Sequence, residues 1–370
     1  MTIPSMIPST MQALRLVAWG EEPQLVEVPV PRPGPGELLL RVDAAGLCHS
    51  DLHVIDSGGR LPYLLPFTLG HEVAGTVAAV GVGVSTAWLD EPVAVHGVWS
   101  CGRCRRCRQG RENACLRLTG PVGCGLGYDG GLAEFMLVPS ERFLVNASGV
   151  AAEELAPLTD AGLTAYHAVA SNLDALSGEA VVLVVGIGGL GHLAIQVLRS
   201  LSTATVMAVD PRESARELAA QHGADLVVAD LSLVAAALDA EDVDAEGGID
   251  LVLDFVGSQA TLGYAASLLA AGGRLVVVGS AGGELVASKA GGLPRDWQVS
   301  APFWGTRSDL EAVVAMAARR DLAAESETGS LTDAPDLYRR LSRGEIRGRA
   351  VVVPNRSRTP LSPAEAHRQH

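Results

Sequence analysis

Four of the six cysteines lie in one short segment whose spacing suits a metal ion: Cys101, Cys104, Cys107 and Cys115. In an intracellular chain such a cluster indicates metal binding rather than disulfides, because several thiolates this close together can surround one ion. Zinc favours a four-thiolate shell, and a closed shell leaves no position for a substrate. We therefore expect a structural zinc site. A redox-active or merely exposed cysteine-rich loop is the alternative.

The residues around these cysteines support the same interpretation. Four thiolates and one Zn²⁺ leave a net negative charge that neighbouring guanidinium groups can offset. Interleaved with the cysteines are Arg103, Arg105, Arg106, Arg108 and Arg111. Outside the cluster, Cys124 lies between two glycines, and we expect it to be a small core residue rather than a ligand.

A second set of ligand-type residues lies elsewhere in the chain. The stretch CHSD begins at Cys48, and His71 lies in the triplet GHE. A catalytic zinc takes three protein ligands and keeps one open position, and a cysteine and a histidine are two of those three. Spacing alone does not identify the third. Asp160, in PLTDAGLTAYHAV, would by itself be interpreted as a helix cap.

The stretch GIGGLG predicts a dinucleotide-binding turn, because it follows an apolar strand and opens a helix. Gly186 permits the tight turn, Gly188 lets the backbone approach a pyrophosphate, and Gly191 allows close packing of helix on strand. Asp210 ends the next predicted strand, where a carboxylate can accept both ribose hydroxyls and repels a 2′-phosphate. This favours NAD over NADP, although Arg212 nearby could bind a 2′-phosphate.

The elements that position these residues differ between the two halves of the chain. Residues 12–150 contain short β-type runs broken by Gly and Pro, which is typical of a β-rich, barrel-like domain. From about residue 160, apolar strands alternate with helical segments, which indicates a doubly wound parallel sheet covered on both faces. The strands are predicted at 180–186, 204–210, 225–230, 249–257 and 273–280. After about residue 300 the pattern is helical, and a final strand at 349–354 is expected to rejoin the first domain.

Length and charge limit the class of protein. With 370 residues, the chain is long enough for about two domains. Its net charge of −14 argues against a nucleic-acid partner, which requires a basic face. No apolar run approaches the ~20 residues of a membrane-spanning helix, and the N-terminus lacks the features of a secretory signal. We therefore expect a cytoplasmic protein without a membrane partner.

Taken together, these motifs resemble the zinc-dependent medium-chain alcohol dehydrogenases from about residue 12 to 354. The resemblance rests on CHSD, GHE, the four-cysteine segment, the strand–glycine–helix unit and the closing RGRAVVVP. It implies an α/β fold, in which a GroES-like β-barrel catalytic domain is joined to a Rossmann domain. We expect the catalytic domain with its structural-zinc lobe at 1–160, the Rossmann NAD-binding domain at 161–300, and a return to the catalytic domain at 301–354. The polar segment 355–370 is expected to be a mobile tail.

The resemblance also implies a role for each residue near the second metal. Cys48, His71 and Asp160 match the catalytic zinc ligands, in the form found in a bacterial branch that has Asp as the third ligand. The remaining residues match auxiliary groups: Asp51 orients His71, Ser50 takes the alcohol proton, His53 forms the outer end of the proton relay, and Glu72 approaches the metal during ligand exchange. Glu72 has an equally plausible purely structural role.

Cofactor and substrate contacts follow from the same resemblance. Cofactor contacts are expected at His49, Thr164, Gly186, Gly188, Gly189, Leu190, Gly191, Asp210, Arg212 and Val278, and at either Arg347 or Arg349, with Arg349 preferred. The apolar candidates for the substrate pocket are Tyr63, Phe303 and Trp304.

The expected protein is thus a dehydrogenase with two zinc ions per chain and NAD. It would interconvert primary or secondary alcohols with aldehydes or ketones, as a homodimer or homotetramer. A polyol dehydrogenase is the alternative within enzymes, and it should show extra polar groups around the zinc. A catalytically silent protein that binds NAD and zinc is the alternative from another class.

Overall fold

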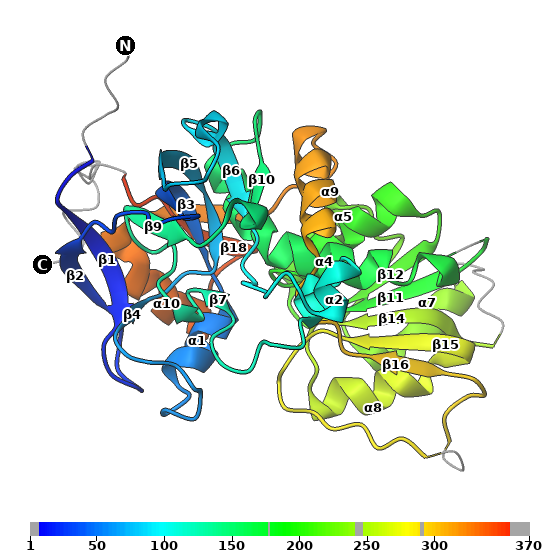
Figure 1. Ribbon diagram of the computed structural model, residues 1–370. Helices are drawn as coiled ribbons and strands as arrows, with labels where there is room; N and C mark the ends of the chain where they lie inside the picture. Colours follow the sequence, from blue (N-terminus) through cyan, green and yellow to red (C-terminus); the bar gives the residue numbers. More distant parts are fainter. Residues whose placement is uncertain (1–6, 177, 241–246, 289–291, 356–370) are drawn as a thin grey trace, which may run out of the picture.

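Two lobes with separate cores make up the protein (Figure 1). The computed structural model describes residues 7–176, 178–240, 247–288 and 292–355. The first lobe is built from β-strands of the N-terminal half, and the second is a six-stranded sheet flanked by helices. Within the described residues no helix has the length and apolar character needed to cross a membrane.

Short β-strands form the first lobe because apolar and small residues alternate between turns. Its main sheet has the order β10-β6-β5-β3-β18-β17, and β9 also pairs with β3. A smaller sheet has the order β2-β1-β4. The strands are β1 (Thr10–Leu16), β2 (Gln24–Pro29), β3 (Leu38–Leu47), β4 (Phe67–Thr68), β5 (Glu72–Val80), β6 (Pro92–Val95), β9 (Phe135–Val138), β10 (Leu144–Asn146), β17 (Ser326–Gly329) and β18 (Arg349–Val352). A large apolar core fills the space between these strands, and a smaller cluster contains Met11, Leu39 and Phe135.

The second lobe is a parallel sheet with strand order β13-β12-β11-β14-β15-β16, the arrangement of a Rossmann domain. The strands are β11 (Val181–Val185), β12 (Thr205–Val209), β13 (Leu226–Val228), β14 (Ile249–Asp254), β15 (Leu269–Val277) and β16 (Gln298–Ser300). Alternate residues of β11 lie in different cores. Val182 and Val184 belong to one core, and Leu183 belongs to the other. This explains the uninterrupted apolar run in the sequence, because both faces of the sheet are buried.

Helices cover both faces of this sheet (Figure 1). Those of the Rossmann lobe are α4 (Ala161–Ala170), α5 (Gly191–Leu201), α6 (Glu213–Gln221), α7 (Val234–Ala240) and α8 (Gln259–Ser267). A further helix, α9 (Arg307–Ala318), packs between the lobes: Leu310 and Val314 enter the barrel core, whereas Val313 and Met316 enter the Rossmann core.

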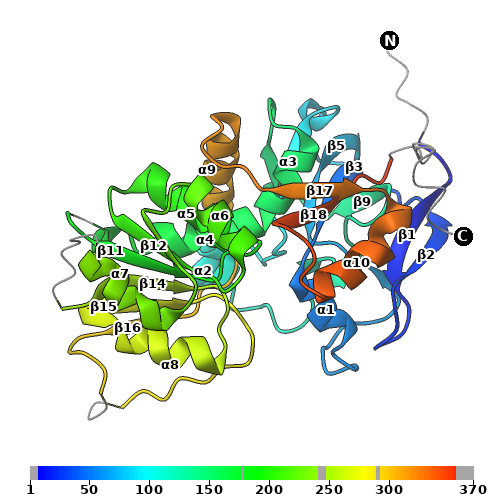
Figure 2. The same cartoon turned by 180° about the vertical axis from the view of Figure 1, so that it is seen from behind.

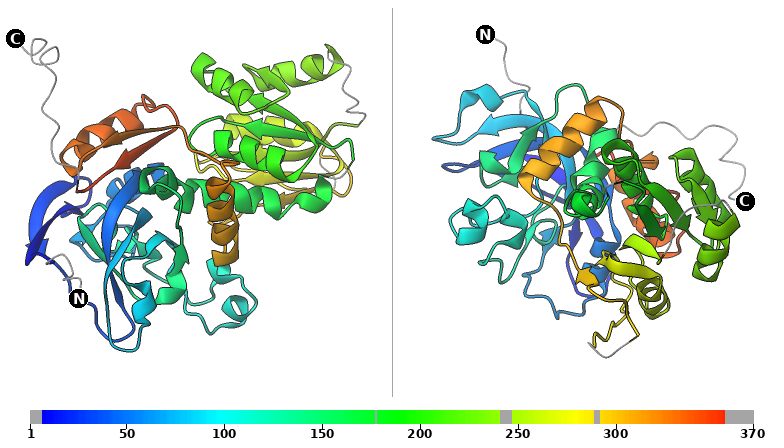
Figure 3. Two further views of the ribbon diagram at one scale, coloured as in Figure 1. Left: turned by 90° about the horizontal axis from the view of Figure 1, so that it is seen from above. Right: turned by 90° about the vertical axis from the view of Figure 1, so that its right-hand side faces the viewer.

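The C-terminal segment pairs with strands of the first lobe. Strand β18 pairs antiparallel with β3, so that Ala350 lies opposite Leu47, and β17 pairs with β18. Helix α10 (Ala334–Ser342) packs beside α1 (His49–Ile55), and these late elements lie against the barrel in two further views (Figures 2 and 3). The expected tail begins with Asn355, whose Nδ2 donates to the Val42 carbonyl at 3.1 Å. Residues 356–370 lie outside the described residues.

Differences from the sequence prediction concern short elements. The predicted strands of the Rossmann sheet are all present, with ends shifted by a few residues. The sixth strand, β16, was not predicted: it has three residues, all exposed, and follows a stretch rich in Gly and Ser. A strand this short carries too little periodicity to be distinguished from a loop.

Candidate active site

Three element ends bring the second set of ligand-type residues together. Cys48 caps α1 directly after β3, His71 immediately precedes β5, and Asp160 precedes α4. Because β3 and β5 are antiparallel neighbours with Gly46 opposite Glu72, the end of one strand lies beside the start of the other. Cys48, His71, Glu72 and Asp160 form a group whose ligand atoms lie within 4.8 Å of one another.

The distances in this group fit zinc. Ligands placed tetrahedrally around zinc, with bonds of 2.0–2.3 Å, lie about 3.6 Å apart for sulfur and oxygen and about 3.4 Å apart for nitrogen and oxygen. Cys48 Sγ lies 3.8 Å from Asp160 Oδ2, and His71 Nε2 lies 3.3 Å from the same oxygen. The buried His71 Nε2 has no hydrogen-bond partner among the described residues, as expected of an atom that ligates a metal. The three side chains therefore suit a zinc ion with an open fourth position.

Asp160 is not the side-chain helix cap that its position alone suggests. Its carboxylate makes no capping hydrogen bond to α4, and instead Oδ1 accepts from Thr164 Oγ1 at 3.2 Å. Burial opposes ionisation of this carboxyl, yet its contact with His71 lowers the pKa of Asp160. An ionised oxygen is thus directed at the ligand group.

Asp51 connects two of the ligand-type residues. Its Oδ1 lies 2.9 Å from His71 Nδ1, and its Oδ2 accepts from the Cys48 backbone N–H at 3.1 Å. Oδ2 also accepts from the hydroxyl of Tyr338 at 2.9 Å. A carboxylate in this place fixes the proton of His71 on Nδ1 and leaves Nε2 free for a metal.

Glu72 and Arg349 form a fully buried ion pair beside this group. Burial raises the pKa of Glu72, to about 7, while Arg349 opposes that rise. Arg349 also lies against the glycine turn, because a Cβ added at Gly189 would come within 2.7 Å of its Nη1. The pair therefore connects the ligand group with the predicted cofactor turn.

Helix α1 places the predicted proton relay. Ser50 Oγ lies 3.6 Å from Cys48 Sγ, and His53 follows one turn later on the same helix with an exposed side chain. Residues three apart share one helix face, so the two side chains can act in sequence toward solvent. His49, also exposed, lies within electrostatic range of Arg349 and Arg212.

The glycine turn lies where the parallel strands end. Gly186 has φ +86°, and a Cβ on Gly191 would lie 2.1 Å from the Gly186 carbonyl oxygen. Both positions therefore require glycine. Leu190 precedes α5, and Val278 follows the end of β15 at the same edge of the sheet.

Asp210 lies directly after β12 and is buried. Its Oδ2 accepts from the Ile187 backbone N–H and Arg212 Nη2, each at 2.9 Å, and its Oδ1 accepts from the backbone N–H and Nε of Arg212. Burial opposes the charge of Asp210, yet the hydrogen bonds from Arg212 lower its pKa. Arg212, the candidate for binding a 2′-phosphate, is thus paired with Asp210 here.

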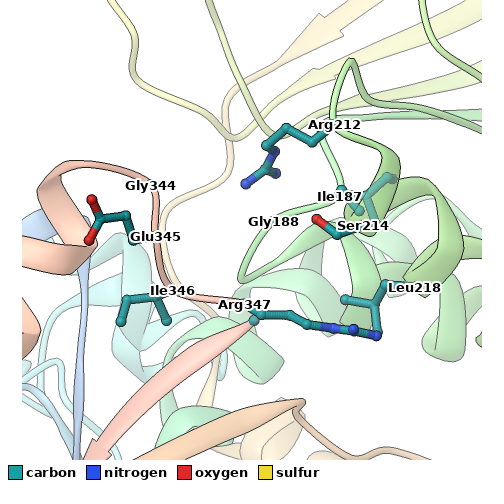
Figure 4. A pocket seen from close by; sticks show the side chains of 11 residues that line it. Ile187, Gly188, Arg212, Ser214, Leu218, Gly344, Glu345, Ile346 and Arg347 are labelled. Atoms are coloured by element: carbon teal, nitrogen blue, oxygen red, sulfur yellow. The ribbon is translucent and has the colours of Figure 1, made fainter.

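Two cavities lie beside the glycine turn, and Arg212 lines both of them. The larger, about 450 Å³, is lined mainly by apolar groups at the strand ends and includes Asp210, Leu231 and Tyr264. The smaller, about 100 Å³, lies between the glycine turn and the C-terminal segment 344–348, and Figure 4 shows Arg212, Glu345 and Arg347 around it. Ligands of such sheets bind outside the carboxyl ends of the strands, which is where both cavities lie.

The sequence left a choice between two arginines for the phosphate contact. Arg347 lines the smaller cavity, and its Nε lies 3.8 Å from Glu325 Oε1. Arg349, in contrast, lies against Gly189.

The four-cysteine segment forms a compact lobe around α2 (Arg105–Arg108). The sulfur of Cys104 lies 3.5 Å from that of Cys107 and 4.0 Å from that of Cys115, and the Cys101–Cys107 distance is also 4.0 Å. Four sulfurs bound tetrahedrally at 2.3 Å lie about 3.8 Å apart, so the cluster fits one zinc. Hydrogen bonds from backbone N–H groups, chiefly that of Cys107, lower the pKa of Cys104 to about 6, which favours a thiolate. Cys124 is buried in the barrel core, as predicted.

The predicted pocket residues differ in exposure. The Phe303 side chain is 48% exposed, Tyr63 packs edge-on against Phe67, and Trp304 is buried. The Trp304 indole lies 5.5 Å from the His71 ring and donates from Nε1 to the Thr159 carbonyl at 3.3 Å. Trp304 thus contacts the ligand group itself.

Sequence reasoning missed Tyr338 and Asn113. Asn113 lies in the four-cysteine lobe, and its Nδ2 donates to the Phe303 carbonyl at 3.0 Å. Neither residue belongs to a motif. Only the helical periodicity of the α10 segment could have indicated that Tyr338 is buried, and periodicity does not identify the partner.

Comparisons with known proteins agree with this geometry. Residues 34–148 match the family model "Alcohol dehydrogenase GroES-like domain", and residues 189–319 match "Zinc-binding dehydrogenase". An NAD-dependent alcohol dehydrogenase of Sulfurisphaera tokodaii is 34% identical over 355 residues, which are 93% of this chain and 100% of the relative.

Solved structures give the same result. The alcohol dehydrogenase of Aeropyrum pernix has a TM-score of 0.84 at 36% identity, covering 93% of this chain and 100% of that one. Acetophenone reductase of Geotrichum candidum, in complex with NAD, has a TM-score of 0.81 at 33% identity, covering 94% and 98%. The predicted pairing of a GroES-like domain with a Rossmann sheet is confirmed.

Proposed function

The chain belongs to the zinc-dependent medium-chain alcohol dehydrogenase family, and from this premise we propose how its residues divide the reaction. The protein interconverts alcohols with aldehydes or ketones, using NAD(H) and zinc. Cys48, His71 and Asp160 hold the catalytic zinc, and the four clustered cysteines hold a structural one. The observation that carries the assignment is the buried His71 Nε2, which lacks a hydrogen-bond partner among the described residues and lies 3.3 Å from Asp160 Oδ2.

Each residue around the ligand group has a separate task. When bound, zinc supplies a Lewis acid for the substrate oxygen, and NAD supplies the hydride acceptor. Ser50 takes the alcohol proton, and His53 passes it toward water. Asp51 holds the His71 ring in the orientation that presents Nε2.

The cofactor residues surround the glycine turn. Backbone N–H groups at the start of α5 would hold the pyrophosphate, and Arg349 would add a positive charge there. Asp210 would accept the ribose hydroxyls, and the 450 Å³ cavity beside it would hold the adenosine. Thr164, His49 and Val278 complete the expected contacts.

Zinc content and turnover test this assignment directly. The purified protein should carry two zinc ions per chain and consume NADH in the presence of a ketone or an aldehyde. Asp160→Ala should retain one zinc and the fold while losing activity. A wild-type protein with a single zinc held by the four-cysteine lobe, or unchanged turnover in Asp160→Ala, would contradict the proposal. A protein that holds both zinc ions and NAD without turnover on any substrate would be the catalytically silent alternative.

We further propose that the substrates are medium-sized or aryl-substituted secondary alcohols and ketones. The aromatic side chains of Tyr63, Phe303 and Trp304 support an apolar pocket, and acetophenone reductase is similar to this chain over almost its whole length. The polyol alternative has a relative named D-arabinose 1-dehydrogenase, which is 31% identical. A panel of aryl ketones, aliphatic aldehydes and sugars separates the two: higher kcat/KM on sugars would favour the alternative.

The proposed assembly is a homodimer formed through β16, with a homotetramer as the alternative. All three residues of β16 are exposed, and among the described residues no strand pairs with its outer side. An edge strand of this kind can pair with another chain. Light scattering of Val299→Pro, which interrupts the strand at this edge, should show a smaller species than wild type. A cytoplasmic location is part of the same proposal, and six cysteines without a disulfide suit a reducing compartment.

A further inference from the structure

Tyr338 connects the C-terminal segment to the ligand group. It lies on α10, its side chain is 4% exposed, and its hydroxyl donates to Asp51 Oδ2 at 2.9 Å across 287 positions of sequence. The tyrosine hydroxyl is the donor of this bond, and the carboxylate oxygen accepts. Burial, together with the charge of Asp51, raises the pKa of Tyr338 well above its ordinary value, so the hydroxyl keeps its proton.

The hydrogen bond completes the partners of Asp51. Oδ1 contacts His71 Nδ1 at 2.9 Å, whereas Oδ2 accepts from the Cys48 N–H at 3.1 Å and from Tyr338. One carboxylate therefore contacts two of the proposed zinc ligands, through a ring and a backbone group. Without the hydroxyl, Oδ2 would keep only the longer of its two bonds, and rotation of the carboxylate would be less restricted.

We propose that Tyr338 is a positioning residue for His71, acting through Asp51. The inference rests on the proposed zinc site of Cys48, His71 and Asp160. The hydroxyl fixes the plane of the Asp51 carboxylate, and the carboxylate fixes the His71 ring with Nε2 directed at the metal. Outer partners of this kind are part of the design of metal sites because they orient the ligands.

Tyr338→Phe tests the role, because it removes one oxygen and leaves the ring packing intact. The measurement is zinc release to a chromogenic chelator, which resolves the two ions of each chain as two phases. One ion should leave about tenfold faster than in wild type, at the low end of the effect of outer partners on metal ligands. The ion of the four-cysteine lobe, which Tyr338 does not touch, should leave at the wild-type rate and serves as an internal reference.

A matched control removes an exposed hydroxyl. Tyr128 is 47% exposed and packs against Trp99, so Tyr128→Phe should leave both phases unchanged. If Tyr338→Phe instead accelerates both phases equally, the hydroxyl supports the fold in general and the inference is wrong. Unchanged release of both ions would also overturn it.

A double-mutant cycle tests whether the effect passes through Asp51. In the Asp51→Ala background the tyrosine has lost its acceptor, so Tyr338→Phe should change zinc release less than twofold there. A tenfold effect that persists in this background would show that Tyr338 does not act through Asp51.

Steady-state kinetics and zinc content complete the design. Since the NAD site is untouched, kcat should fall while the KM for NAD stays constant. If the zinc assignment itself is wrong, the result differs. The wild-type protein would then carry a single zinc ion, or Asp160→Ala would keep as many zinc ions as wild type. Two ions in wild type with no Tyr338 effect would reject only the positioning role.

Discussion

Replacing Asp210 by Ala should weaken the binding of NAD and improve the use of NADP. In the structure the Asp210 carboxylate accepts four hydrogen bonds, three of them from Arg212 and one from the Ile187 backbone. Its side chain is almost fully buried, whereas that of Arg212 is 49% exposed. The substitution therefore removes the proposed ribose acceptor and also releases a guanidinium group beside the place of the 2′-hydroxyl.

The magnitude follows from these contacts. A hydrogen bond to a charged group contributes about 1.5–3 kcal/mol, and part of the capacity of Asp210 is already used by Arg212. We therefore assign about 2 kcal/mol to ribose binding, which corresponds to a roughly 30-fold rise in the KM for NAD. For NADP the change has the opposite sign, because the 2′-phosphate no longer meets a carboxylate and gains Arg212.

The assay is kcat/KM for both cofactors with one ketone, in wild type, Asp210→Ala, Arg212→Ala and the double variant. The preference for NAD over NADP should fall by more than about 30-fold in Asp210→Ala, and removal of Arg212 should abolish the gain for NADP. Melting curves exclude a general loss of fold after the bond to Ile187 is removed. An unchanged ratio of the two cofactors in a folded Asp210→Ala protein would refute the reasoning.

Three further predictions concern the metal sites and a buried histidine. Asp160→Ala should lower the zinc content from two ions to one and reduce kcat/KM by more than about 100-fold, because loss of a ligand exceeds the effect of an outer partner; atomic absorption and kinetics measure both. Cys104→Ser should lower the melting temperature and release the other ion, with the catalytic zinc retained. Burial lowers the pKa of His192 to about 4, below the 6.5 of the unfolded chain. The neutral, buried histidine therefore makes its full contribution to the free energy of unfolding above about pH 6.5, and this contribution is lost as the pH falls toward 4. Urea unfolding should therefore show a loss of about 2 kcal/mol from this residue between pH 7 and 5, and His192→Gln should remove that part of the loss; an identical pH dependence in the variant would contradict the assignment.

The Rossmann lobe was predictable because its signals are local. A strand such as Val181–Val185 is apolar on both faces, and the glycine turn follows directly, so pattern and motif agree within a few residues. For the barrel lobe, the sequence predicted the fold class but not the pairing of the strands. The pairing of β3 with both β5 and β18 depends on contacts between distant segments, for which a single sequence carries no signal.

The two predicted metal sites also differ in whether their sequence signal is local. The four cysteines lie within one short segment, so their spacing alone indicates a shared ion. Cys48, His71 and Asp160 come from three distant segments, and composition gave no reason to choose Asp160 over other carboxylates. The family resemblance indicated it, and the fold brings its Oδ2 to 3.3 Å from His71 Nε2.

The return of the chain to the first lobe has a chemical consequence beyond completing a sheet. Trp304, Tyr338 and Arg349 all lie after the Rossmann strands in sequence, yet each contacts a residue of the ligand group or its carboxylate partners: His71, Asp51 and Glu72 respectively. Arg349 lies in β18, whose pairing with β3 sets its position beside Glu72. The zinc site therefore has its full set of contacts only when the segment that follows the Rossmann strands has packed against the first lobe and β18 has paired with β3. A chain that ended at the Rossmann lobe would leave the Glu72 carboxylate buried without its cation, which is strongly unfavourable.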